Sequence, residues 1–309
     1  MTDVQASVQG DAELDRVRRI LRGGVDLHVH TAPSPMPRII DAVDAARQAD
    51  ELEMRAIVIK SHHHSTVVDV LALQKHGLQD AHAQVFGGIA LNSTVGGLNP
   101  HAVDLALKQG GRIVWFPTIA SPRHIEHHHA HPNLKFPKLD IVLEPEEPID
   151  VFDEQGSLRP EVYHIIEQIR DADAILASGH MAPKSIIAVF KAAHDMGVRR
   201  LLVNHPNFVI QANYAEVHQL VDLGAVIEHS LCMYDDRSTF YEWDLDVLLE
   251  WLRELGPEHS SLGSDLGQAR NPLPSESFVK IVRALLRAGM SEETLRQIVC
   301  DNPARLLGI

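Results

Sequence analysis

The sequence contains 20 histidines, and some stand where an imidazole can bind a metal ion, for which histidine is the commonest side-chain ligand. Residues 26–30 read Asp-Leu-His-Val-His. Because residues two apart in a strand point the same way, we expect Asp26, His28 and His30 to share one face. Two imidazoles on one face can ligate one ion at about 2.0–2.1 Å. His-x-His alone is a weak signal in a chain this rich in histidine.

Three further apolar runs end in residues that can bind a metal. These endings are Ser178-Gly179-His180, Asn204-His205-Pro206 and Gly263-Ser264-Asp265. Each could separately be an inert residue held by hydrogen bonds. However, titratable groups that converge at the same end of several strands are typical of a functional site. The endings therefore predict that His180, His205 and Asp265 join His28 and His30 around a metal.

Such a site needs a scaffold, and the chain shows β-branched runs that alternate with segments of helical spacing. The expected strands are Val25–His30, Ala56–His62, Gln84–Leu91, Arg112–Thr118, Ile175–His180, Leu201–His205, Ala225–Leu231 and Ser260–Asp265. The expected helices are Arg38–Asp50, Thr66–His76, Pro100–Lys108, Pro160–Asp171, Lys184–Met196, Tyr214–Leu223, Leu245–Leu255 and Ser277–Ala288.

Eight β–α units in about 270 residues match the size of a TIM barrel, whose active sites lie at the carboxyl ends of the strands. The alternative is an open doubly wound sheet, but no glycine-rich nucleotide loop follows the first strand. We predict an α/β protein with a (β/α)8 TIM barrel and a C-terminal helix, in one domain over residues 1–309. Residues 1–22 are expected to form an N-terminal arm or helix.

One connection is much longer than the others. Residues 119–159 follow the fourth strand, and a connection of this length is usually functional or disordered. We predict that Ile119–Glu147 forms a lid, with Arg123 and Lys135 placed to meet an anionic substrate. The alternative is a surface excursion used for contact between subunits. Its histidines can bind metal as a tract or can stand in a solvated loop, and we favour the solvated tip of a lid with adventitious metal binding; they are His124, His127, His128, His129 and His131.

The composition narrows the classes of partner. The formal net charge is −14, and an acidic surface repels phosphate backbones, which argues against nucleic acid. No run approaches the roughly 18 apolar residues that span a bilayer. The two cysteines cannot form a disulfide framework, which suits a reducing compartment. We therefore expect a cytoplasmic homo-oligomer that acts on a small molecule and has neither a membrane nor a nucleic-acid partner.

The arrangement of these residues resembles the amidohydrolase superfamily over nearly the whole chain. That pattern is His-x-His on strand one, a histidine on strands five and six and an aspartate on strand eight of a TIM barrel; here these are His28 and His30, His180, His205 and Asp265. The closing residues, with Asn-Pro-Ala-Arg at 302–305, also look like the final helix of that superfamily. The resemblance implies a divalent metal, zinc first and manganese second, as one or two ions.

The chain departs from the family on the fourth strand, RIVWFPT, which lacks the lysine or glutamate that many two-metal members use. Lys60 stands on the second strand instead and shares a face with His62, a candidate substrate contact. After carboxylation Lys60 can bridge two ions, and unmodified it can bind a substrate carboxylate; the alternative is a lysine that reaches solvent. Glu228 is expected to support a ligand rather than to be one.

The chemistry implied is hydrolysis by a metal-activated water, on an amide, lactam or ester. Asp265 would accept the water proton, and His205 would bind a second ion or polarise the carbonyl. Three alternatives stay open: decarboxylation or C–C hydrolysis on the same scaffold, a phosphoesterase, and a metal-binding protein without turnover.

Overall fold

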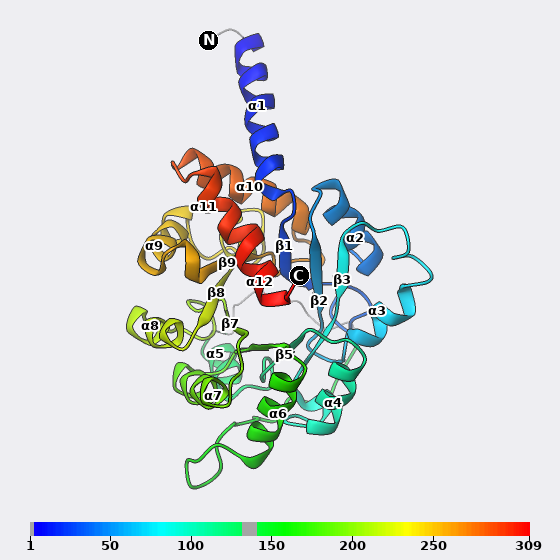
Figure 1. The fold of residues 1–309 in the computed structure, drawn as a ribbon, viewed down its shortest axis with the longest axis vertical. Helices are drawn as coiled ribbons and strands as arrows, with labels where there is room; N and C mark the ends of the chain where they lie inside the picture. Colours follow the sequence, from blue (N-terminus) through cyan, green and yellow to red (C-terminus); the bar gives the residue numbers. More distant parts are fainter. Residues whose placement is uncertain (1–2, 132–140) are drawn as a thin grey trace.

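The computed structural model describes residues 3–131 and 141–309 of the chain. Figure 1 shows a ring of strands surrounded by helices. The strands are β1 (Val25–His30), β2 (Ala56–Lys60), β3 (Gln84–Phe86), β4 (Gly88–Ala90), β5 (Ile113–Trp115), β6 (Ile175–Ala177), β7 (Leu201–Asn204), β8 (Ala225–Ser230) and β9 (Ser260–Gly263).

The strands pair in parallel and in chain order, as β1-β2-β3 and as β4 through β9. The single third strand predicted over Gln84–Leu91 is wrong, because that run forms two short strands that divide at Gly87. The Thr66 side chain and backbone occupy the gap: the Thr66 backbone N–H donates to the Gly88 carbonyl (3.0 Å), and the Gly88 N–H donates to the Thr66 hydroxyl (3.0 Å). β3 therefore pairs with β2 and β4 with β5.

The ring closes between the last and first strands. The Asp265 N–H donates to the His28 carbonyl, and the His30 N–H donates to the Leu266 carbonyl, both at 2.8 Å. A sheet closed by its own backbone bonds has no edge at this seam. With helices outside every side of the ring, the predicted (β/α)8 barrel is confirmed.

The helices follow the predicted order. They are α1 (Asp3–Leu21), α2 (Ala42–Glu51), α3 (Val67–Leu73), α4 (Pro100–Lys108), α5 (Pro122–Ala130), α6 (Pro160–Asp171), α7 (Pro183–Asp195), α8 (Tyr214–Asp222), α9 (Leu245–Leu255), α10 (Pro274–Arg287), α11 (Glu292–Arg296) and α12 (Asn302–Leu307). α5 lies in the long connection where only a lid was predicted. Of the described residues, no helix is long and apolar enough to cross a membrane.

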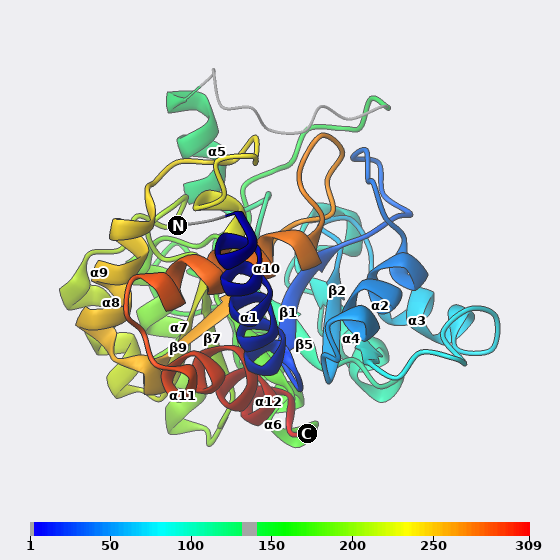
Figure 2. The same ribbon diagram turned by 90° about the horizontal axis from the view of Figure 1, so that it is seen from above.

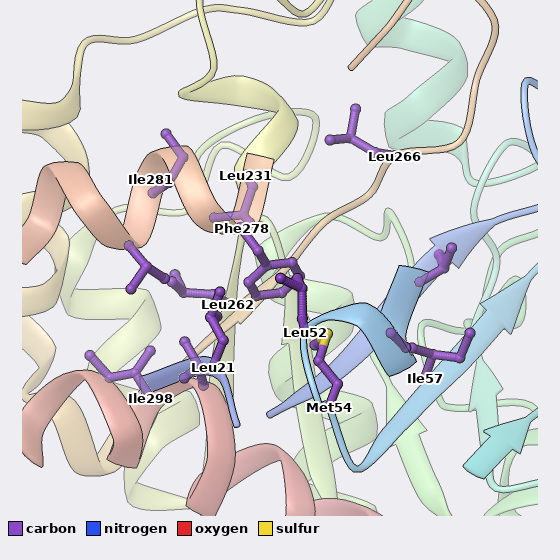
Figure 3. Packing of buried hydrophobic residues seen from close by; sticks show 14 of the residues in the cluster. Leu21, Leu52, Met54, Ile57, Leu231, Leu262, Leu266, Phe278, Ile281 and Ile298 are labelled. Carbon is purple, nitrogen blue, oxygen red and sulfur yellow. The ribbon is translucent and has the colours of Figure 1, made fainter. Parts of the chain in front are cut away.

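Apolar layers lie on both sides of the strand ring. Inside, side chains such as Leu27, Val58 and Trp115 pack with Leu306 and Leu307 of α12, which lies across one end of the barrel (Figure 1). Outside, Leu262 and Phe278 belong to the layer between the strands and the helices (Figure 3). Figure 2 shows α5 at the end opposite α12. The interior is thus plugged at one end and carries polar groups at the other.

A buried carboxylate ties the segment after β8 to α10. The Asp235 side chain is fully buried and accepts from the Ser277 hydroxyl and from Lys280 Nζ at 2.7 Å. Arg237 Nη2 donates to it at 2.8 Å. Burial alone would raise the pKa of Asp235, but these hydrogen bonds outweigh burial and lower that pKa well below its ordinary value.

We predict that Asp235→Asn lowers the free energy of unfolding by about 2 kcal/mol at pH 7, since it weakens charged hydrogen bonds. A lowered folded-state pKa gives stability that is present above the unfolded pKa of about 4 and is lost as the pH falls further. Urea unfolding from pH 7 to pH 3 should therefore show the difference shrinking on acidification. Asp195→Asn, in an exposed pair with Lys191, is the control and should change stability little. A difference independent of pH would contradict the account.

Candidate metal centre

The first strand turns both of its histidines toward the barrel mouth. The β1–β2 register shifts between Asp26 and Val29. Leu27 lies in the inner core, whereas Asp26 and Val29 line a small pocket beneath α2 and α10. The prediction that Asp26 shares a face with His28 and His30 is therefore wrong, because the irregularity breaks the alternation of side chains. Asp26 is structural: it accepts from the backbone N–H groups of His28 and Ser264, both at 3.0 Å.

Three predicted ligands converge at the seam of the barrel. Nε2 of His28 lies 3.1 Å from Oδ1 of Asp265, and Nε2 of His30 lies 3.0 Å from the same oxygen. These three side chains form a group that could hold a metal ion. Asp265 has a φ of +51°, a conformation that side-chain-bearing residues rarely adopt, and such backbone strain is concentrated at functional sites.

The outer ring nitrogens of both histidines are already engaged. Nδ1 of His28 lies 2.7 Å from Oε1 of Glu228, and Nδ1 of His30 lies 3.2 Å from the Lys60 carbonyl. Because both partners are acceptors, each Nδ1 carries a proton, and in a neutral ring Nε2 then presents a lone pair. Burial lowers the pKa of His30 well below its ordinary value, which favours the neutral ring. When both rings are in this neutral form, two lone pairs face a carboxylate oxygen, an arrangement that a bound cation stabilises.

The carboxylate is held in its charged form. Burial alone would raise the pKa of Asp265, but the adjacent rings of His28 and His30, which in their protonated form donate to the carboxylate when no ion is bound, outweigh burial and lower that pKa well below its ordinary value. The donor set of two imidazoles and one carboxylate suits zinc and tolerates manganese. The residues present thus fit a divalent ion.

Lys60 lies beside His28, as we expect for a residue on the inner face of β2. Its Nζ is 3.0 Å from Nε2 of His28, and the side chain is fully buried. Burial lowers the pKa of Lys60 to about 8. The amine is therefore easier to deprotonate than a surface lysine, which metal binding and carboxylation both need. The alternative that the Lys60 side chain reaches solvent is wrong, because this side chain is buried.

His180 follows β6 through a backbone approach that only glycine permits. Gly179 has a φ of +59°, and a Cβ built there would lie 2.1 Å from the Phe116 carbonyl oxygen. The His180 N–H then donates to the Pro117 carbonyl at 3.0 Å. The ring centroids of His180 and His205 are 4.9 Å apart, so the endings of β6 and β7 meet as predicted.

His124 is a site residue that the sequence interpretation missed. It lies on α5, is buried, and places its Nδ1 2.8 Å from Nδ1 of His180. The interpretation of His124 as a solvated lid residue is therefore wrong. The sequence did contain a sign of this helix, because Ser121-Pro122 is a pair that can begin a helix and the residues after it have helical spacing. Residues 132–140 of the predicted lid lie outside the described residues.

His205 and His62 complete the ring of imidazoles. Burial lowers the pKa of His205 to about 4, and its φ of +24° places it in the left-handed region. Nδ1 of His62 is 2.8 Å from the Thr118 hydroxyl, and the His62 centroid is 5.1 Å from that of His30. These rings therefore stand beside the three converging ligands at the mouth.

A cavity of about 470 Å³ opens above these groups. It is lined by His30, Met36, Arg38, His62, His124, His180, His205, Phe208, Val209, Cys232, Met233, Phe240, Asp265 and Gln268. Arg123 lines a different pocket, and its guanidinium donates to the Val209 carbonyl (3.0 Å) and to Gln211. Substrate binding by Arg123 stays a prediction, and Lys135 lies outside the described residues. Arg38 and Gln268 had not been predicted as site residues.

Comparison with known proteins places this geometry in context. A family model described as "Family of unknown function (DUF6282)" matches residues 23–228, and the chain belongs to this family. No curated protein matches the chain.

Solved structures share the fold. An amidohydrolase from Pseudomonas aeruginosa superposes with a TM-score of 0.63 at 10% identity, covering 96% of this chain and 98% of that one. An amidohydrolase from Burkholderia multivorans with bound zinc gives 0.58 at 12% identity, with 93% and 99% covered. A putative 2-pyrone-4,6-dicarboxylic acid hydrolase from Pseudomonas putida gives 0.56 at 16%, with 93% and 97% covered. The barrel fold that the resemblance implies is thus shared with these structures.

We predict that Glu228→Gln weakens zinc binding about 10- to 100-fold, because the amide no longer fixes the protonated Nδ1 of His28 as strongly. Competition with a chelator of known affinity measures the change. Glu254→Gln is the matched control, since Glu254 pairs with His218 on the surface at 2.8 Å. Equal zinc affinity in both variants would show that Glu228 does not support the site.

Proposed function

We propose that the protein is a metal-dependent hydrolase that cleaves an amide, lactam or ester bond of a small molecule. The observation that carries the proposal is the convergence of the Nε2 atoms of His28 and His30 on one oxygen of the Asp265 carboxylate. The shared fold with amidohydrolases, including one with bound zinc, supports it.

His28, His30 and Asp265 would hold one ion, with zinc as the first choice and manganese as the second. Bound there, a divalent ion would lower the pKa of its water from about 15.7 toward 7. A second ion, if bound, would be held by Lys60, His180 and His205. His124 stands beside His180 and adds an imidazole that the predicted ligand set lacked.

Asp265 and His205 would have different roles in the reaction. Asp265, ionised and beside the cavity, would accept the water proton and pass it to the leaving group. If one ion is bound, His205 would polarise the carbonyl and stabilise the oxyanion. A largely apolar pocket with a few convergent polar groups is the usual form of a small-molecule site. Assembly as a cytoplasmic homo-oligomer without membrane or nucleic-acid partners remains part of the proposal.

Metal removal tests the proposal. We predict that protein stripped with a chelator loses hydrolysis of its substrates in a screen of amides, lactones and phosphate esters, and that zinc or manganese restores it. Release of carbon dioxide instead of hydrolysis products would favour the decarboxylase alternative. Undiminished hydrolysis in the stripped protein would contradict the proposal.

We further predict that Asp265→Asn folds normally but loses turnover by about 10²–10⁴, the usual contribution of general acid–base catalysis. Asparagine tolerates the positive φ at this position, so the fold should survive. Circular dichroism checks the fold and steady-state kinetics the rate. Asp301→Asn, at an exposed position near α12, should keep full activity. Retained activity in Asp265→Asn would remove this residue from the mechanism.

A further inference from the structure

Three side chains that line the cavity carry buried polar atoms without hydrogen-bond partners among the described residues, and two of them, Gln268 and Arg38, lie outside the proposed metal centre. Oε1 of Gln268 is one such atom; this side chain is only 4% exposed. Its amide orientation is fixed, because Nε2 donates to the Asp265 carbonyl at 3.0 Å. Oε1 is therefore an acceptor, and burial of an unsatisfied acceptor is costly. Native structures keep such groups where a ligand or water completes them.

Arg38 is the second group. Its Nε and Nη1 are buried without an acceptor, and no carboxylate of the described residues pairs with it within 4 Å. Nη2 lies 3.4 Å from Nδ1 of His30, a long contact to a nitrogen that also lies 3.2 Å from the Lys60 carbonyl oxygen. The remaining contact, to the Met36 sulfur at 3.9 Å, is weak. A guanidinium in this state is prepared for an anion.

The two groups are held side by side. Arg38 and Gln268 face each other in an isolated antiparallel bridge, and both side chains line the cavity. The Ala269 N–H donates to the Pro37 carbonyl at 3.0 Å and reinforces this pairing. The cavity thus offers one cluster of cationic donors next to one neutral acceptor.

The rest of the cavity wall is largely apolar. Its apolar members are Met36, Phe208, Val209, Met233 and Phe240. Asp265 is the one carboxylate in the described lining, and it is engaged by the histidines. An anionic small molecule with an apolar body therefore meets complementary surroundings, whereas a cationic small molecule would not.

We propose that Arg38 and Gln268 form a substrate-binding subsite for a carboxylate and an adjacent N–H donor. The inference rests on the proposed function and specifies its substrate class: an acylamino acid or a similar small carboxylic acid with an apolar side chain. The carboxylate would accept from Arg38, the N–H would donate to Gln268, and the apolar body would lie against Phe208 and Met233. Arg38 is here a binding residue rather than a catalytic one.

Binding without turnover tests the subsite. The probe is N-acetyl-L-leucine, measured by saturation-transfer NMR and calorimetry on zinc-loaded and on chelator-stripped protein. We expect N-acetyl-L-leucinamide, which lacks the carboxylate, to bind about ten- to a hundredfold more weakly. N-acetyl-N-methyl-L-leucine, which lacks the N–H, should bind at least about fivefold more weakly. A set of matched acids and amides with other apolar side chains extends the comparison.

Variants locate the effect. Arg38→Met should abolish the preference for acid over amide while zinc content stays unchanged, and Arg38→Lys should restore part of it. Arg199→Met, whose guanidinium is exposed and paired with Asp173 at 3.1 Å, is the control and should keep the preference. Equal binding of acids and amides, or binding of neither class, would overturn the inference. So would loss of zinc in Arg38→Met, because Arg38 would then be a positioning residue for the metal ligands.

The same experiment separates this inference from the proposed function. Preference for acids in a protein that hydrolyses nothing would contradict the hydrolase and keep the subsite. Hydrolysis without a preference for acids over amides would support the hydrolase and contradict the subsite.

Discussion

The seam between β9 and β1 is the interaction on which the rest of the structure depends. The backbone of Asp265 donates to His28, and the backbone of His30 donates to Leu266, both at 2.8 Å. The residues whose hydrogen bonds close the barrel are therefore the residues whose side chains converge on one point. The backbone pairing thus brings together side chains whose Nε2 and Oδ1 atoms lie 3.0–3.1 Å apart. Such a site is preorganised, which limits the entropy lost when an ion or a substrate binds.

Burying this many polar groups at one barrel end is expensive unless each has a partner. Most do: Glu228 accepts from Asn204 Nδ2 at 3.0 Å and contacts His28 at 2.7 Å. Thr118 is held by Asn92 at 2.6 Å and supports His62. Among the described residues that line the cavity, the buried polar atoms without a partner are Nε and Nη1 of Arg38, Oε1 of Gln268 and Nδ1 of His205. Other buried atoms without a partner, such as both ring nitrogens of His229, lie elsewhere in the molecule. The unsatisfied atoms at Arg38 and Gln268 are the ones on which the proposed anion subsite rests, next to the proposed metal centre.

The sequence allowed the barrel and the strand-end ligands to be predicted because both follow from local patterns. Apolar runs followed by polar residues mark where a parallel strand ends, and this is sufficient for His28, His30, His180, His205 and Asp265. Asp26 was misplaced, because the register shift in β1 depends on its pairing with β2. His124, Arg38 and Gln268 were missed for a related reason. His124 contacts His180, which is 56 residues away in the sequence. Arg38 and Gln268 pair with each other across the barrel seam. Local spacing in the sequence cannot predict contacts of this kind.

The central claim is that His28, His30 and Asp265 bind a divalent ion. A crystal structure of the protein with stoichiometric zinc, with anomalous diffraction recorded on both sides of the zinc edge, tests it most directly. The account predicts an anomalous peak about 2.0–2.3 Å from Nε2 of both histidines and from an Asp265 oxygen. It also predicts that Nζ of Lys60 gives up its contact with Nε2 of His28. No peak at this position, with the Lys60–His28 contact intact, would contradict the account.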